Sequence, residues 1–243
     1  MTEQLPKRVR ARLAALVAQY ELGPAAEERL SIFLAELAED EHAPTTVRDP
    51  SAAVDVHVAD ALAGLEIEQL RAAGRIADLG AGAGVPGLIL AAALPNARVA
   101  LLESVGRKCA FMDRVEAAMG LDNAEVVPGR AETWADGLGA CDAVTARALA
   151  PLPVLAEYAA PLLRLGGALV AWKGTPDAAE DADGEAAARI LGLSSADRRA
   201  VTPYDGADRH SLYLYLKVGS TPNQYPRRPG IARKRPLRAS SGG

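Results

Sequence analysis

The segment IADLGAGAGVPGLIL, residues 76 to 90, holds the residues whose types and spacing point most clearly to a chemical function. An apolar run ends at Asp78, glycines alternate through Gly80, Gly82 and Gly84, and an apolar run then resumes. A loop of this kind between a strand and a helix lets backbone N–H groups approach a ligand closely. Dinucleotides, phosphates and S-adenosylmethionine all bind such loops, so the segment predicts a cofactor without identifying it.

Two acidic residues near this loop bear on which cofactor it holds. Glu103 follows Gly82 by about twenty residues, at the end of the next predicted strand, where a ribose-binding acid belongs. The spacing of the glycines also satisfies GxGxxG, which suits NAD. Asp78, however, would repel a pyrophosphate, whereas S-adenosylmethionine brings an ammonium and a sulfonium group. We therefore expect S-adenosylmethionine, with an NAD-dependent oxidoreductase as the alternative.

The order of predicted elements indicates an α/β fold. Helical spacing of apolar residues at 7 to 20 and 24 to 41 predicts an N-terminal helical cap. From residue 75, the β-rich runs RIADLG, RVALLE, AEVVPG, CDAVTAR and ALVAWKG alternate with predicted helices at 86 to 93, 105 to 119, 152 to 164 and 177 to 191. This βαβ repetition predicts a Rossmann-like, doubly wound parallel sheet. The strict alternation in HSLYLYLKV predicts a last strand at or near the sheet edge.

Length and charge divide the chain into three predicted parts: a helical cap over 1–60, a Rossmann-like core over 61–218 and a basic tail over 219–243. The tail contains six cations and no acidic residue, although the whole chain has a net charge of −4. These cations are Arg227, Arg228, Arg233, Lys234, Arg235 and Arg238. We expect the tail to contact a polyanion, in which case truncation after Val218 would leave cofactor affinity unchanged. The alternatives are a solvated terminus and a tail that packs back on the acidic body.

Other features of the sequence narrow the class of protein. The 243 residues contain no apolar run as long as a membrane span, and the start lacks the apolar core of a signal peptide, so we expect a cytoplasmic protein. Cys109 and Cys141 have no partners at metal-ligand spacing, and the three histidines form no ligand pair. We expect two reduced, buried cysteines and no metal site.

The stretch DLGAGAGVPG, residues 78 to 87, resembles the first motif of class I methyltransferases, which use S-adenosylmethionine. Further segments along nearly the whole chain resemble one family, the ribosomal RNA small-subunit methyltransferase G family, also called glucose-inhibited division protein B. These segments are TTVRDP, VHVADAL, LLESVGRK, GRAE, TARALAPL, AWKG and the tail sequence PGIARKRPL. The chain departs from the family pattern at Val56, where a basic residue often precedes the histidine, and in the alanine-rich TARALAP.

The resemblance implies methyl transfer from S-adenosylmethionine to N7 of a guanosine in the decoding-region loop of small-subunit ribosomal RNA. The N7 atom carries an in-plane lone pair, so its methylation needs alignment and no base to remove a proton. A cytosine-C5 enzyme would need a cysteine nucleophile, but Cys109 falls within a predicted helix and Cys141 at the start of a strand. The Asn/Asp-Pro-Pro-aromatic motif of exocyclic-amine enzymes is absent from the sequence.

The resemblance also implies roles for individual residues. Cofactor contacts are expected from Asp78, Gly80, Gly82, Gly84, Val85, Glu103, Ala131, Glu132 and Arg147. Arg147, Lys173 and His57 are expected to position the reacting groups, with no general base among them. RNA contacts are expected from Arg48, Lys173 and the six tail cations. The partner would be small-subunit ribosomal RNA or the assembling small ribosomal subunit, and no membrane; the sequence does not fix the oligomeric state, and we expect a monomer.

Each polar residue also has a structural interpretation. Glu132 and Arg147 would form a surface ion pair, His57 would bond to Asp60 one turn further on, and Arg48 would pair with Asp49. Trp172 and Tyr204 could stack on a base, but buried packing is the expected role. A non-enzymatic RNA-binding module, which would use the basic tail and leave the glycine loop empty, is the third functional class to distinguish.

Overall fold

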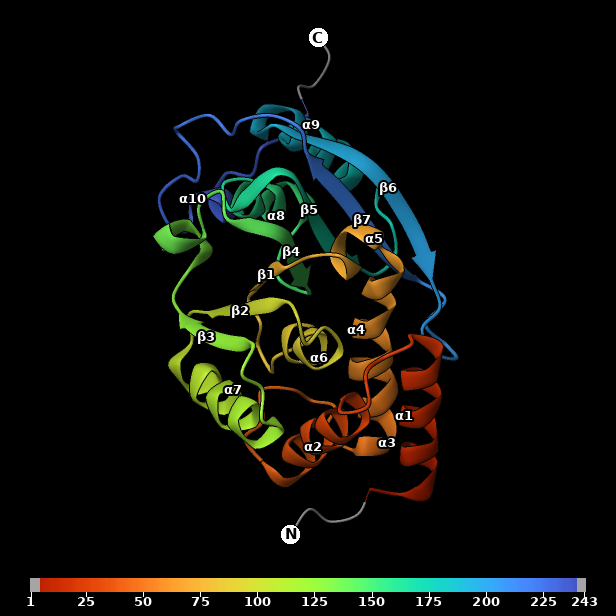
Figure 1. Ribbon diagram of the computed structural model, residues 1–243. Helices are drawn as coiled ribbons and strands as arrows, with labels where there is room; N and C mark the ends of the chain where they lie inside the picture. Colours follow the sequence, from red (N-terminus) through yellow and green to blue (C-terminus); the bar gives the residue numbers. More distant parts are fainter. Residues whose placement is uncertain (1–4, 240–243) are drawn as a thin grey trace.

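A computed structural model describes residues 5–239, which form a seven-stranded sheet with helices packed against both faces (Figure 1). The strand order is β3-β2-β1-β4-β5-β7-β6. In chain order the strands are β1 Arg75–Leu79, β2 Arg98–Glu103, β3 Ala124–Pro128, β4 Cys141–Arg147, β5 Leu163–Lys173, β6 Leu193–Val201 and β7 His210–Lys217. The predicted α/β class and its Rossmann-like core are confirmed, and strand β1 lies beside β4 where the winding changes direction.

The sheet departs from the predicted parallel arrangement at one side. Strands β1 to β5 pair in parallel, but β7 pairs antiparallel with β5, and β6 pairs antiparallel with β7. The short connection between β6 and β7 makes them a hairpin, which requires antiparallel pairing. The sequence did not predict β6, because seven of its nine residues are exposed and carry no apolar alternation. The expected position of β7 near the edge is confirmed, with β6 as the edge strand itself.

The helices cover the sheet in two groups. The α-helices are α1 Lys7–Gln19, α2 Ala26–Glu39, α3 Pro50–Ala53, α4 Asp60–Ala63, α5 Glu68–Arg71, α6 Gly87–Ala93, α7 Gly106–Met119, α8 Leu152–Ala159, α9 Ala178–Leu191 and α10 Ile231–Lys234. A π-helical segment, η1 Val54–Ala59, joins α3 to α4, and short 3₁₀ segments are η2 Gly64–Glu66, η3 Ala131–Thr133 and η4 Ala135–Gly137. The helix predicted at 152 to 164 is too long, because α8 ends at Ala159 and β5 begins four residues later.

The N-terminal helices pack on one face of the sheet together with α6 and α7. In α1 the buried residues Val9, Leu13 and Leu16 recur at helical spacing, which places them on one side of the helix. They join one hydrophobic core with residues of α2, α4 and α6. A second core, between the other face and helices α8 and α9, contains Leu155 and Tyr215. Among the described residues, no helix is both long and apolar enough to cross a membrane.

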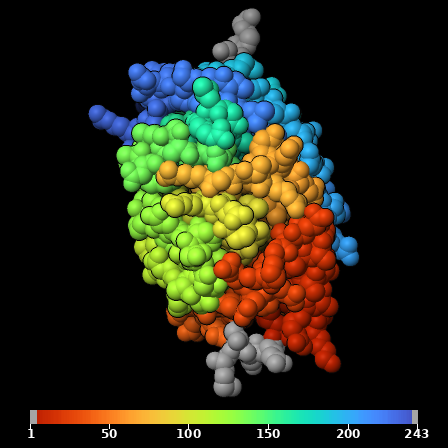
Figure 2. All heavy atoms as spheres, in the orientation of Figure 1, coloured from red at the N-terminus to blue at the C-terminus, as the bar shows by residue number. Residues whose placement is uncertain are grey.

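The C-terminal segment 219–239 packs against the body of the protein. The buried carboxylate of Glu157 in α8, whose side chain is 1% exposed, pairs with the guanidinium of Arg227, whose Nε donates to Oε1 at 2.8 Å. Ala232 of α10 is buried in the α8 core, and the backbone N–H of Ala239 donates to Asp183. Figure 2 shows this blue segment lying across the end of the molecule remote from the red N-terminal helices. Arg227 therefore attaches the tail to α8 through Glu157, and the RNA contact expected of it stays a prediction.

The buried pair generates a prediction about stability. Arg227→Ala leaves the Glu157 carboxylate buried without its cation, which should lower the free energy of unfolding by about 3 kcal/mol. Arg228→Ala removes the same charge from the neighbouring exposed position and should change the free energy of unfolding by less than about 0.5 kcal/mol. Chemical denaturation of the two variants measures both values. Equal stabilities would show that the tail contributes nothing to folding through this pair.

Candidate functional site

Two neighbouring cavities lie at the edge of the sheet where the parallel strands have their carboxyl ends. The larger cavity, of about 600 Å³, is lined by Asp60, Arg147, Trp172, Lys173 and His210, among others. The smaller cavity, of about 380 Å³, is lined by residues that follow β1, β2 and β3, including Gly80, Glu103, Ala131 and Glu132. Ala148 and Leu149, directly after β4, line both cavities and form a shared wall. Open α/β sheets bind their ligands at this edge.

The glycine loop, residues 78 to 87, borders the smaller cavity. Gly80, Gly82 and Gly84 all have positive φ angles, of +65°, +61° and +82°, which side chains rarely adopt. A Cβ atom on Gly80 would lie 2.6 Å from Leu149, and one on Gly84 would lie 2.3 Å from Leu88. A Cβ on Gly82 would meet only the Gly80 carbonyl oxygen, at 3.7 Å. The backbone at Gly82 is thus the part of the loop with space beside it for a ligand.

Glu103 is held at the end of β2 by backbone N–H groups. Its Oε1 accepts from Ser104 and Val105 at 2.8 and 2.9 Å, and its Oε2 accepts from Gly82 at 3.2 Å. The Lys108 ammonium lies 3.6 Å from Oε2. These contacts connect the acid to the glycine loop and fix the carboxylate in the lining of the smaller cavity.

Asp78 does not reach the cavity, so the direct cofactor contact expected from its charge is wrong. Its side chain is 0% exposed, Oδ1 accepts from the Thr145 hydroxyl at 2.9 Å, and Oδ2 accepts from the Gly87 N–H at 2.9 Å. Burial raises the pKa of Asp78 to about 7, against the lowering effect of these two hydrogen bonds. The carboxyl group therefore anchors the loop to β4 and the start of α6. Gly87 must be glycine, because a Cβ there would lie 2.1 Å from Leu101.

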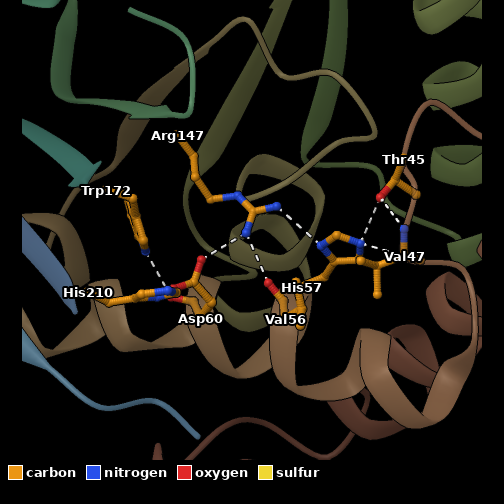
Figure 3. A network of polar contacts seen from close by, with 8 residues as sticks. All are labelled: Thr45, Val47, Val56, His57, Asp60, Arg147, Trp172 and His210. Atoms are coloured by element: carbon orange, nitrogen blue, oxygen red, sulfur yellow. Dashed lines mark hydrogen bonds and ion pairs between the residues drawn. The ribbon is translucent and has the colours of Figure 1, made fainter. Parts of the chain in front are cut away.

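Arg147 is the centre of a polar network on the floor of the larger cavity (Figure 3). One terminal nitrogen donates to the Val56 carbonyl at 2.9 Å and to Asp60 Oδ2 at 2.8 Å, and the other lies 3.2 Å from His57 Nδ1. The side chain thus connects β4 to the helical segment 54–63. The expected surface ion pair with Glu132 does not form; Asp60 is the partner of Arg147.

His57 is buried beneath Arg147, and its imidazole nitrogens contact other groups of the protein. A guanidinium can only donate, so Nδ1 accepts and the ring proton lies on Nε2, which donates to the Val47 carbonyl at 3.0 Å. Burial and the Arg147 charge lower the pKa of His57 to about 4, so the ring is neutral at pH 7. The expected bond to Asp60 is wrong, and so is contact with RNA, because the ring is enclosed by Thr45, Val47 and Arg147. Positioning of the reacting groups by His57 stays a prediction.

Asp60 joins three elements to the helical segment. Its carboxylate, in a residue only 3% exposed, accepts from Arg147 and lies 2.9 Å from Nδ1 of His210, and its carbonyl accepts from Trp172 Nε1 at 2.8 Å. Trp172 is buried, which confirms packing as its role. His210, with a side chain 33% exposed, lines the larger cavity and packs edge-to-face on Tyr204. Sequence reasoning missed His210, because only the reversal of β7 brings its first residue to this edge.

The remaining predicted residues lie around the two cavities. Lys173 lines the larger cavity and pairs with Glu180 at 2.6 Å. Glu132 accepts from the backbone N–H of Gly230 in the tail at 3.1 Å. Val85 is buried within the loop. Arg48 donates to the Asp40 carbonyl at 3.3 Å, whereas Asp49 caps α3 through the Ser51 N–H, so the expected Arg48 to Asp49 pair is wrong.

The cysteines bear on a possible thiol nucleophile, and the positions of the His, Cys, Asp and Glu side chains bear on a possible metal site. Cys109 and Cys141 are both free and buried, as expected. Burial raises the pKa of both thiols, that of Cys141 to about 11, so neither is an activated nucleophile. Residues 5–239 contain no group of three or more His, Cys, Asp or Glu side chains that could hold a metal ion.

The fold and the glycine loop define a class I methyltransferase. A solved structure of similar fold, a Methanococcus jannaschii fibrillarin pre-rRNA processing protein, matches with a TM-score of 0.53 at 19% identity, over 67% of this chain and 74% of that one. The family model of rRNA small subunit methyltransferase G matches residues 26–210. The chain belongs to this family, as the sequence resemblance implied.

Two curated relatives bear the same family name, Ribosomal RNA small subunit methyltransferase G. The protein from Rubrobacter xylanophilus is 44% identical over 197 residues, which are 79% of this chain and 76% of the relative. That from Thermotoga neapolitana is 38% identical over 211 residues, 86% of this chain and 91% of the relative. Family membership sets aside both the NAD-dependent oxidoreductase and the non-enzymatic RNA-binding module, and it implies S-adenosylmethionine as the cofactor.

The buried Asp78 carboxyl generates a prediction about pH. Its pKa rises from 3.8 to about 7 on folding, so the native state disfavours the ionised form, and this penalty grows as pH rises from about 4 to 7. Asp78→Asn does not titrate. Its free energy of unfolding relative to the parent should therefore increase by about 4 kcal/mol between about pH 4 and pH 8. Denaturant titrations across this range measure the difference, and a difference that stays constant or falls with pH would contradict the assignment.

Proposed function

We propose that this chain transfers a methyl group from S-adenosylmethionine to N7 of a guanine in small-subunit ribosomal RNA. The observation that carries the proposal is the pair of cavities at one sheet edge, which share the wall of Ala148 and Leu149. The smaller cavity offers a glycine loop and a fixed carboxylate, whereas the larger one offers cationic and aromatic side chains. A cofactor and a flipped base bound in the two cavities would meet at their common wall.

The lining of the smaller cavity fits S-adenosylmethionine. Gly80 and Glu103 line this cavity, and the Gly82 N–H is bonded to Glu103. The open backbone at Gly82 suits the methionine portion, and the carboxylate of Glu103 suits the two ribose hydroxyls. Ala131 and Glu132, which follow β3, lie where the adenine would be. When bound, the cofactor supplies a methyl group activated by its sulfonium. The residues of this chain hold it and do not alter its chemistry.

The larger cavity would position the guanine rather than deprotonate it. His210 and Lys173 line it and can orient a guanine through the polar groups of the base or the adjoining phosphate. Arg147 and His57 keep the floor of the cavity rigid, because the donors and acceptors described above are engaged with each other. Attack by N7 needs this alignment alone, since the atom already carries a lone pair and loses no proton.

The surrounding cations would bind the RNA backbone. Lys173 lines the larger cavity, Arg48 lies in the segment before α3, and the exposed cations of the tail segment are Arg228, Lys234, Arg235 and Arg238. Each cation that neutralises a phosphate on single-stranded RNA contributes about 0.7 to the slope of log affinity against log salt. The RNA could be free or within an assembling small ribosomal subunit, and a monomer suffices because both cavities are formed by one chain.

The cofactor assignment predicts that alanine substitutions at two glycines of similar conformation have different effects on S-adenosylmethionine binding. Gly82→Ala and Gly139→Ala each place a side chain at a φ near +60° without a steric clash, so each should cost about 1 kcal/mol of stability. Only Gly82→Ala fills the space beside the loop, and it should weaken S-adenosylmethionine binding at least about tenfold. Calorimetric titration of both variants tests this. Similar affinities for the two variants would exclude the loop as the cofactor site.

The site of methylation can be tested with modified RNA. The target is first mapped by transferring a radiolabelled methyl group to small-subunit RNA and locating the label. A transcript with 7-deazaguanosine at that position lacks only the N7 lone pair and should accept no methyl group. An inosine transcript, which keeps N7 but lacks the exocyclic amine, should still be methylated. Label on the 7-deazaguanosine transcript would show that another atom is the acceptor.

A further inference from the structure

Arg233, in the C-terminal helix α10, reaches the wall between the two cavities. Its guanidinium donates to the Leu149 carbonyl at 2.8 Å, and its side chain lines the smaller cavity, as Gly80 of the glycine loop does. The bond to Leu149 uses one nitrogen of a planar group that carries five N–H donors. The tail, expected from sequence only as an RNA contact, thus contributes a side chain to the proposed cofactor pocket.

Three contacts fix the backbone that presents Arg233. The Gly230 N–H donates to Glu132 Oε1 at 3.1 Å, Ala232 is buried against α8, and Arg227 is paired with Glu157 upstream. The arginine side chain is exposed, but the backbone directly before it is fixed by these contacts. Its position at the cavity follows from the packing of the tail rather than from a free side chain at the surface.

We infer that Arg233 binds the adenosine end of the cofactor, with its guanidinium packed flat against the adenine ring. This inference rests on the proposed cofactor site. The charged sulfonium, ammonium and carboxylate of S-adenosylmethionine all belong to its methionine portion, which the glycine loop would hold. Arg233 shares the cavity lining with Glu132, which follows β3 and binds the Gly230 N–H beside α10, so the adenine is the part of the cofactor assigned to it. Arginine also stacks favourably on aromatic faces.

The residues near Arg233 support its assignment to the adenosine end of the cofactor. Glu132, which follows β3, and Tyr158 of α8 both line the smaller cavity together with Arg233. Burial and the charge of Glu132 raise the pKa of Tyr158, and the charge of Arg233 opposes this rise. Because truncation after Val218 would remove Arg233 from the lining of the smaller cavity, this inference predicts that truncation weakens cofactor binding, contrary to the expectation from sequence.

The test is calorimetric titration of the full-length protein with S-adenosylmethionine and S-adenosylhomocysteine. Arg233→Ala and Arg233→Met should each weaken both ligands by about tenfold, and should weaken 5′-methylthioadenosine, which keeps the adenosine but has no carboxylate, by the same factor. Unchanged affinity for 5′-methylthioadenosine would place the arginine at the carboxylate and overturn the inference. Arg235→Ala removes the same charge two residues away, from an exposed side chain in the same segment, and should stay within about twofold of the parent. Thermal unfolding of each variant should match the parent, because the exposed side chain contributes little to the core.

The outcomes separate this inference from the proposed function. If the parent binds neither ligand, the cofactor site itself is wrong. If the parent binds both, but Arg233→Ala stays within about twofold, the arginine does not contact the cofactor. If Arg233→Ala weakens one ligand and tightens S-adenosylmethionine, the arginine lies at the sulfonium end and the inference is overturned. Full affinity in Arg233→Met would show that the guanidinium is not needed.

Discussion

The site depends on one buried carboxylate, that of Asp60. A charge in such an environment is costly unless it is paired and fully hydrogen-bonded. Asp60 meets this requirement with Arg147 from β4 and His210 from β7, while its own carbonyl accepts from Trp172 of β5. Because these partners come from three strands, the helical segment that carries Asp60 can lie in only one position on the sheet edge. The floor of the larger cavity is a consequence of that constraint.

The same network explains how a methyltransferase can work without an acid or a base. The polar groups beneath the larger cavity are turned toward one another: His57 is neutral with its proton on Nε2, and Arg147 is held by two acceptors and the imidazole. Groups that are engaged in this way hold a fixed geometry and do not transfer protons. For a ring nitrogen with its own lone pair, fixed geometry is the main requirement. The buried cysteines, with raised thiol pKa values, add no competing nucleophile.

The C-terminal tail contacts both the folded core and the candidate site. Its sequence, rich in arginine and proline, is typical of a segment that binds a polyanion, and several of its cations are exposed, as the proposed RNA contact requires. One arginine, however, is used to neutralise Glu157, and another extends to the shared wall at Leu149. Identical residue types in one short segment thus take three different roles. Composition alone cannot assign them, because the role of each depends on which buried group lies opposite.

The sequence by itself determined the fold class, the glycine loop and the family, because periodicity, glycine spacing and local motifs are properties of neighbouring residues. It also placed Gly82, Glu103 and Lys173 at strand ends, where ligands bind. Only the tertiary structure decided that Asp78 is buried behind the loop, that His57 lies under Arg147, and that His210 enters the site. Those outcomes depend on contacts between residues far apart in the chain and on the antiparallel reversal of β7. A sequence shows which groups are available, but burial and pairing are set only when distant elements pack together.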